Sequence, residues 1–104
     1  MFDMTENDVK AVYAQLKDQY DLTLTNTFAL DSGFEEDCPI LVGRRDGYIL
    51  WLYEWGGDFV LDVLDEKMTA GTHWHPEDVE EAVADILDFF EKKPDYKLHR
   101  LPKG

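Results

Sequence analysis

The sequence has few of the features that mark secreted or membrane-embedded proteins. It contains one cysteine, Cys38, so no internal disulfide can form, and a lone thiol fits a reducing compartment. No apolar run approaches the ~20 residues that a membrane-spanning helix needs. Residues 1–4 lack the basic and apolar segments of a secretory signal. We therefore expect a cytoplasmic protein that does not bind membranes.

Basic residues are also scarce. Ten Lys and Arg stand against 23 Asp and Glu, and the formal net charge is −13. The acidic excess belongs to residues 1–91, because the last 13 residues are basic; they carry Lys92, Lys93, Lys97, Arg100 and Lys103 against Asp95 alone. Such a charge repels nucleic acid and anionic membranes and attracts a basic protein. We expect a basic protein as partner.

Catalytic motifs are missing as well, since the chain has neither a nucleophile elbow nor a phosphate-binding loop. His73 and His75 form the one cluster that would suit a metal, because residues two apart in an extended segment point the same way. No third ligand has diagnostic spacing. We expect no metal, no cofactor and no enzymatic activity; a small metal-binding module or enzyme that uses His73 and His75 is the alternative.

The strongest local signals are two-residue turns. Asp46-Gly47 and Gly56-Gly57 each separate two apolar runs, which predicts a three-stranded meander. Apolar residues at helical spacing predict two amphipathic helices, the second opened by Pro76, and alternation predicts a further strand. The expected elements are a helix over 6–20, strands over 22–31, 40–45, 48–55 and 58–65, a loop over 66–75, a helix over 76–93 and a basic tail over 94–104.

This order of elements predicts a single domain over residues 1–104 of the α+β class. We expect a two-layer sandwich in which both helices lie on one face of a four-stranded antiparallel sheet, in the order α-β-β-β-β-α. The position of the first strand stays open, since the loop that follows it could place it beside the second strand or at the far edge. The tail over 96–101 could form a short edge strand or an ordered arm.

The two turns also fix the register of the meander and so divide its side chains between two faces. One face is aliphatic and is the expected core, where Gly43 leaves room for a helix; it comprises Leu41, Gly43, Leu50, Leu52, Phe59, Leu61 and Val63. The other face mixes large aromatic rings with aspartates; it comprises Ile40, Val42, Ile49, Trp51, Tyr53, Trp55, Asp58, Val60, Asp62 and Leu64.

The mixed face is typical of a binding patch. A covered face rarely carries unpartnered aspartates, and a solvated face rarely carries two Trp and a Tyr. We expect Trp51, Tyr53 and Trp55 to anchor a partner and Asp58 and Asp62 to pair with its charges. His73 and Trp74 of the 66–75 loop extend this surface. Two other interpretations stay open: cross-strand stacking of the aromatics alone, and a homodimeric scaffold joined sheet to sheet.

A family resemblance supports the binding interpretation. The hairpin segment 48–55 (YILWLYEW) and the segment 71–76 (GTHWHP), which leads into the acidic last helix, resemble the immunity proteins of bacterial polymorphic-toxin systems. That resemblance implies a non-catalytic inhibitor that binds a cognate basic toxin, often a nuclease, and occludes its active site. The basic tail departs from the pattern of such proteins.

Overall fold

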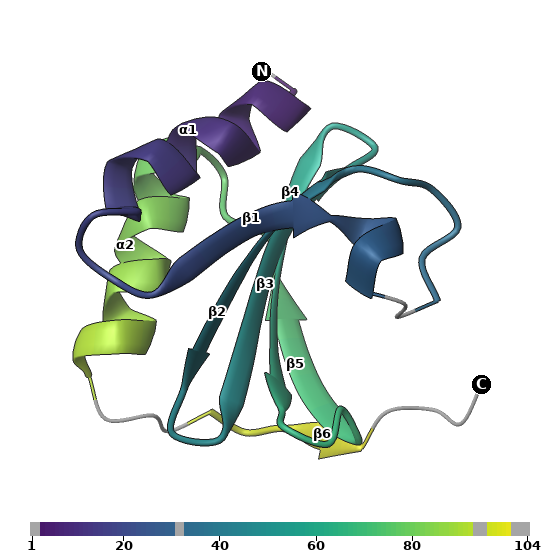
Figure 1. Cartoon of the computed structure of the whole chain (residues 1–104), viewed down its shortest axis with the longest axis vertical. Coiled ribbons are helices and arrows are strands. Elements are labelled where there is room, and N and C mark those ends of the chain that lie inside the picture. Colours follow the sequence, from purple (N-terminus) through teal and green to yellow (C-terminus); the bar gives the residue numbers. More distant parts are fainter. Residues whose placement is uncertain (1–2, 31–32, 93–95, 101–104) are drawn as a thin grey trace.

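Six strands form one antiparallel sheet in sequence order, β1-β2-β3-β4-β5-β6, and two helices pack against it (Figure 1). The computed structural model describes residues 3–30, 33–92 and 96–100. The class is α+β, as predicted. The elements are α1 (Glu6–Leu16), β1 (Leu22–Asn26), the 3-10 helix η1 (Thr27–Leu30), β2 (Pro39–Arg45), β3 (Tyr48–Trp55), β4 (Asp58–Asp65), β5 (Ala70–Trp74), α2 (Val79–Glu91) and β6 (His99–Arg100).

The central meander follows the predicted strands closely. Asp46 and Gly47 have φ values of 50° and 86°, and Gly56 and Gly57 have 62° and 87°. Positive φ at both central residues is the conformation of the tight hairpin turn that Asp-Gly and Gly-Gly favour. The register that these turns fix is confirmed: Leu41 lies opposite Leu52, Trp51 opposite Asp62, and Trp55 opposite Asp58.

The sheet has two more strands than the predicted four. The segment expected to be a loop over 66–75 contains β5, which pairs with β4, and the tail contains β6, which pairs with β5. Gly71 allows the close pairing, because a Cβ at that position would lie 3.0 Å from Leu64 Cδ2 and 3.2 Å from the Val63 carbonyl oxygen. The sequence of β5 (AGTHW) has no run of alternating apolar residues, so only its partner strand makes it recognisable.

Three boundaries also differ from the prediction. The strand expected over 22–31 ends at Asn26, because the buried Thr27 turns the chain: its hydroxyl donates to the Glu36 carbonyl oxygen at 2.6 Å and accepts from the Cys38 amide at 2.9 Å. The first helix ends at Leu16 and the second begins at Val79, where Asp78 caps it by accepting from the Glu81 amide at 2.8 Å. Predicted residues 31, 93–95 and 101–104 lie outside the described part.

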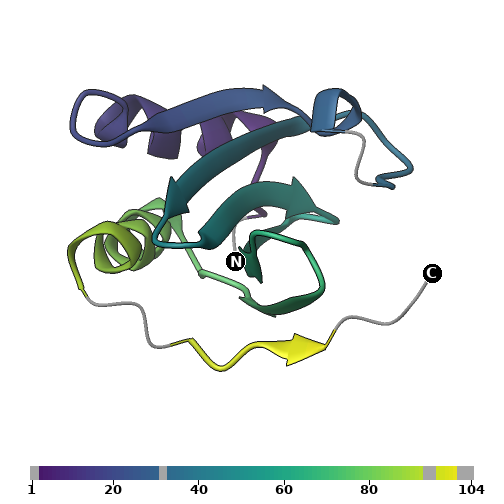
Figure 2. The ribbon, with the colours of Figure 1, turned by 60° about the horizontal axis from the view of Figure 1, so that its bottom comes forward.

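Both helices cover the aliphatic face of the sheet, as predicted (Figure 1). The shared core joins Val9, Val12 and Leu16 of α1 and Ala82, Ile86 and Phe89 of α2 to the aliphatic face of the meander. The first strand lies beside the second, which settles the position that the sequence left open. Figure 2 shows that the sheet curls, with β1 and β6 at its opposite edges.

Gly43 is the point of closest approach between the sheet and α2. A Cβ there would lie 2.9 Å from Phe90 Cζ and 3.0 Å from Leu22 Cδ2. The Phe90 ring has little freedom to move away, because Tyr20 stacks on it with ring centroids 4.6 Å apart. The absence of a side chain at position 43 therefore allows α2 to lie against the sheet.

Replacing Gly43 with Val should overpack this contact and lower the free energy of unfolding by about 1–3 kcal/mol. Urea denaturation of the variant and the parent protein measures the difference. Arg44→Val is the matched control, since it adds the same side chain at the exposed neighbouring position and should change stability by about 0.5 kcal/mol or less. Equal stability of Gly43→Val and the parent would contradict the proposed tight contact.

Candidate functional site

The mixed face of the sheet is covered over much of its area. Five of its residues form a second buried cluster: Ile40, Val42, Ile49, Trp51 and Leu64. Leu30 of η1 and Phe34 of the following loop pack over this cluster from the side opposite the helices, and the Phe34 ring centroid lies 5.8 Å from that of Trp51. Trp51 is 7% exposed. It is a core residue, which corrects the expectation that it lies open as a binding anchor.

Tyr53 and Asp62 are partly buried on the same face and interact with each other. Burial raises the pKa of the Asp62 carboxyl, while a hydrogen bond from the Tyr53 hydroxyl and the nearby His73 and His75 act to lower it. Burial also raises the pKa of Tyr53, and the Asp62 charge adds to that effect. Asp62 is therefore engaged within the protein, and it differs from the freely exposed charge partner that the sequence suggested.

The residues of the 73–75 segment point in different directions. Trp74 turns toward the helices: its Nε1 donates to Asp85 Oδ2 of α2 at 2.8 Å, and its ring stacks on Tyr96. His73 is exposed and lies opposite Asp62 in the β4–β5 register. Trp74 thus helps to hold α2 on the sheet and does not extend the aromatic patch, whereas His73 stays on the mixed face.

The two imidazoles of this segment lie near each other, with ring centroids 5.7 Å apart. His75 Nδ1 lies 2.9 Å from the Phe59 carbonyl oxygen, which can only accept, so Nδ1 carries the hydrogen and Nε2 alone is free. In the described ranges, no group of three or more His, Cys, Asp and Glu side chains could hold a metal ion.

Trp55 is the large aromatic of the patch that remains open, with 46% of its surface exposed. It lies at the end of β3, beside the Gly56-Gly57 turn, and lines two depressions. One is an apolar groove of about 380 Å³, lined by Gly33, Phe34, Glu35, Tyr53, Trp55 and Val60. The other is an acidic pocket of about 310 Å³, lined by Glu6, Glu36, Asp37, Cys38, Glu54, Trp55 and Gly56.

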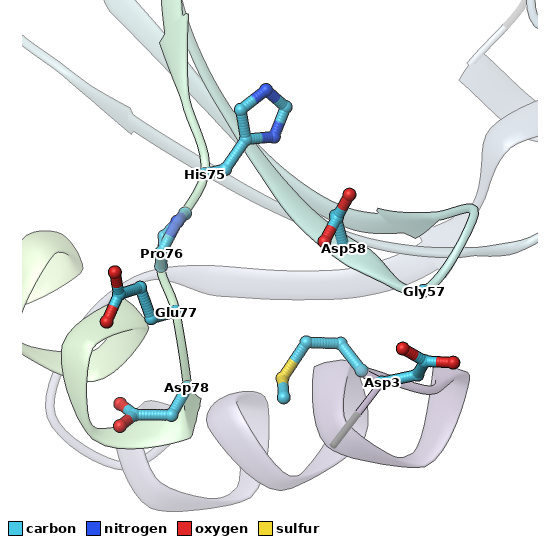
Figure 3. Close-up of a pocket in the computed structure, with 8 residues that line it drawn as sticks. Asp3, Gly57, Asp58, His75, Pro76, Glu77 and Asp78 are labelled. Atoms are coloured by element: carbon cyan, nitrogen blue, oxygen red, sulfur yellow. The ribbon is translucent and has the colours of Figure 1, made fainter. Parts of the chain in front are cut away.

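A third pocket, of about 550 Å³, adjoins the start of β4, where Gly57 and Asp58 line it (Figure 3). Figure 3 shows residues of three segments around one opening: Asp3, Gly57 with Asp58, and His75 to Asp78; Met4 also lines this pocket. The N-terminal segment is held against the turn, because the Met4 amide donates to the Gly57 carbonyl oxygen at 2.7 Å. Asp58, a predicted charge partner, lies here and is exposed.

The three depressions meet at the tip of the β3–β4 hairpin, and we call this region the acidic hairpin end. Nine acidic residues of the described part line it: Asp3, Glu6, Glu35, Glu36, Asp37, Glu54, Asp58, Glu77 and Asp78. Among the described residues, no Lys or Arg lines any of the three. The two ion pairs found among the described residues lie elsewhere, between Arg45 and Asp46 and between Lys92 and Asp88. The acidic hairpin end thus concentrates negative charge, and five of its acids line the two depressions that Trp55 also lines.

Sequence reasoning identified Trp55, Tyr53 and Asp58 of this region and missed most of the acids. Glu6 comes from the start of α1, and Glu36 and Asp37 from the loop before β2, so only the fold brings them together. Phe34 was missed for the same reason, since a single aromatic in an acidic loop has no periodic pattern.

No family model, no curated protein and no solved structure matches the chain. No helix in the described part is long and apolar enough to span a membrane.

Substitution of Asp62 with Asn should stabilise the protein in a pH-dependent way. The pKa of Asp62 is raised in the folded state, so the folded protein binds this proton more tightly than the unfolded chain. Ionised Asp62 consequently weakens the fold above its folded pKa, and that penalty vanishes as the pH falls below the unfolded value. We expect a higher melting temperature for Asp62→Asn at neutral pH and a gain that shrinks on acidification.

Thermal unfolding at a series of pH values measures this effect. Asp58→Asn is the matched control, because it removes a carboxylate from the same face of the same strand at an exposed position. A gain for Asp62→Asn that is the same at neutral and acid pH, or a loss at neutral pH, would contradict the assignment.

Fluorescence quenching should distinguish Trp55 from Trp51. Cs⁺ collects near carboxylates and I⁻ is repelled by them, so Cs⁺ should quench this protein more strongly, relative to I⁻, than it quenches N-acetyltryptophanamide. Trp55→Phe should abolish most of that preference, and Trp51→Phe should leave it unchanged because Trp51 is buried. If Trp51→Phe abolished the preference for Cs⁺ and Trp55→Phe left it unchanged, Trp51 would be the open indole and the assignment would be wrong.

Proposed function

We propose that this chain is a non-catalytic inhibitor of the immunity-protein kind, which binds a basic toxin through the acidic hairpin end. The observation that carries the proposal is Trp55, a half-exposed indole that shares two depressions with five acidic residues, while no Lys or Arg of the described part lines the acidic hairpin end. Tryptophan is among the residues that most often dominate binding energy at protein interfaces, and it does so where neighbouring groups exclude water around it.

Electrostatics supports a basic partner. Nine like charges at one end of a small domain attract a cationic protein over a distance of about 10 Å at moderate salt and raise the rate of encounter. The same charges repel each other in the free protein. A cationic partner relieves that repulsion, so the free energy gained on binding includes a term that an uncharged partner could not supply.

The resemblance to immunity proteins indicates which kind of basic protein the partner would be, namely a toxin that is often a nuclease. An enzyme that cleaves nucleic acid holds its substrate with Lys and Arg side chains that contact phosphates. A surface dense in carboxylates is complementary to such a site, so the acidic hairpin end would cover it and exclude the substrate. The chain itself needs no catalytic group to act in this way.

Two features weigh against the alternative of a sheet-to-sheet homodimer. Leu30 and Phe34 already cover much of the face that such a dimer would join. The part that remains open is the acidic hairpin end, and two copies of it would repel each other. A partner of opposite charge fits this surface better than a second copy does.

Affinity capture in the host, followed by a toxicity assay, tests the proposed function. We expect the tagged chain to retain a basic protein at low salt and to lose it progressively as salt rises, because screening weakens charge–charge attraction. Expression of the captured protein alone should arrest growth, and co-expression of this chain should restore it. A captured protein that is not toxic, or whose toxicity this chain does not relieve, would contradict the proposal.

Trp55→Ala should weaken capture and rescue by about 30-fold or more, the loss typical of an interface hot spot. Met68→Ala is the matched control, since Met68 is also an exposed apolar residue but lies after β4, at the far end of the sheet from the Gly56-Gly57 turn. It should leave both readouts unchanged. Circular dichroism of each variant verifies that the fold is retained.

A further inference from the structure

The apolar groove beside Trp55 has the form of a side-chain binding site. Tyr53 and Trp55 stand two residues apart on β3 and so share a face, and Val60 lies opposite Tyr53 on β4. Phe34 closes the remaining side, with its ring edge-on to Tyr53 at a centroid distance of 5.1 Å. These four apolar or aromatic side chains, together with Gly33 and Glu35, line an open groove of about 380 Å³, which has room for one aliphatic side chain of a partner.

Trp55 lines both this groove and the acidic pocket, so the two depressions adjoin at this residue. The acidic pocket is lined further by Glu6, Glu36, Asp37 and Glu54. A cation held near the face of a Trp ring is attracted by the ring quadrupole, most strongly where the site is partly desolvated. The two depressions therefore differ in the groups they favour: the groove has one acid, Glu35, among mostly apolar side chains and favours an apolar group, whereas the pocket has four acids and favours a cation.

In an extended segment, side chains two residues apart point the same way and are separated by about 7 Å. Such a spacing allows one side chain to enter the groove while the other reaches the adjoining acidic pocket, because Trp55 lines both depressions. We infer that the groove at Trp55 receives an extended segment of the partner in which an aliphatic side chain and a Lys or Arg stand two residues apart. The aliphatic group enters the groove between Phe34 and Val60, and the cation lies against Trp55 toward the acidic pocket.

This inference rests on the proposed function and adds the chemistry of the segment that docks. It assigns a role to Trp55, which is exposed although Trp51, on the same face of the same strand, is covered. Phe34 packs on Trp51 and Tyr53 and reaches only the edge of the groove, so the last aromatic of the strand is left for a partner.

A peptide titration tests the inference without the natural partner. The probe is acetyl-Leu-Ser-Arg-amide, and its two controls are acetyl-Leu-Ser-citrulline-amide, which has the same shape without the charge, and acetyl-Gly-Ser-Arg-amide, which lacks the aliphatic group. The readout is the set of three tryptophan indole N–H signals in ¹H–¹⁵N NMR spectra of the intact protein, with Trp55→Phe assigning the Trp55 signal.

We expect the Leu-Ser-Arg peptide to shift the Trp55 signal and to leave those of Trp51 and Trp74 in place. Each control peptide should bind at least about fivefold more weakly, because it loses either the cation or the aliphatic contact. Glu36→Gln should weaken binding of the probe about two- to fivefold, and Glu66→Gln, an exposed acid at the far end of β4, should not.

Two outcomes would overturn the inference: a citrulline peptide that shifts Trp55 as strongly as the arginine peptide, or an arginine peptide that shifts no tryptophan signal. Neither outcome bears on the proposed function, which depends on capture and rescue by the whole chain. If Trp55→Ala abolishes rescue while the peptides fail, Trp55 contacts the toxin through other chemistry and the inference is wrong. If the peptide binds as expected and no toxic partner is neutralised, the proposed function fails alone.

Discussion

The side-chain alternation along β3 determines where each group of the site lies. Two glycine-containing turns fix the register of this strand against both neighbours, so Leu50 and Leu52 face the helices while Trp51, Tyr53 and Trp55 face the other way. A shift of one residue would exchange these sets and place three aromatic rings in the helical core. The core, the covered part of the mixed face and the open indole are therefore consequences of one pairing pattern.

The mixed face has a buried part and an exposed part, because the segment that covers it, with Leu30 and Phe34, does not extend over the whole face. Leu30 and Phe34 reach the middle of the face and bury Trp51, and the Thr27 hydroxyl holds the covering loop in place through its bonds to Glu36 and Cys38. The cover ends before Trp55. Aromatic residues that are equivalent in sequence thus have different surroundings, because Trp51 is buried under the cover and Trp55 is half-exposed.

Local signals in the sequence were sufficient for the meander and its register. Asp46-Gly47 and Gly56-Gly57 act on their immediate neighbours. The burial of Trp51 could not be predicted in the same way, since its cover comes from a loop without periodic pattern. β5 and the convergence of Glu6 and Glu36 on Trp55 also depend on contacts between distant segments.

The distribution of charge suggests why such a site can exist in so acidic a chain. At the far end of the sheet Arg45 is used structurally: its Nη1 donates to the carbonyl oxygens of Phe89 and Lys92, where the unpaired carbonyls of α2 carry a partial negative charge. The acids at the hairpin end have no comparable cation in the sets that line the three depressions. Their mutual repulsion lowers the stability of the free protein, and a bound cation removes it. A surface that is unfavourable alone and favourable in a complex is selective for that complex, because only a partner of opposite charge relieves the repulsion.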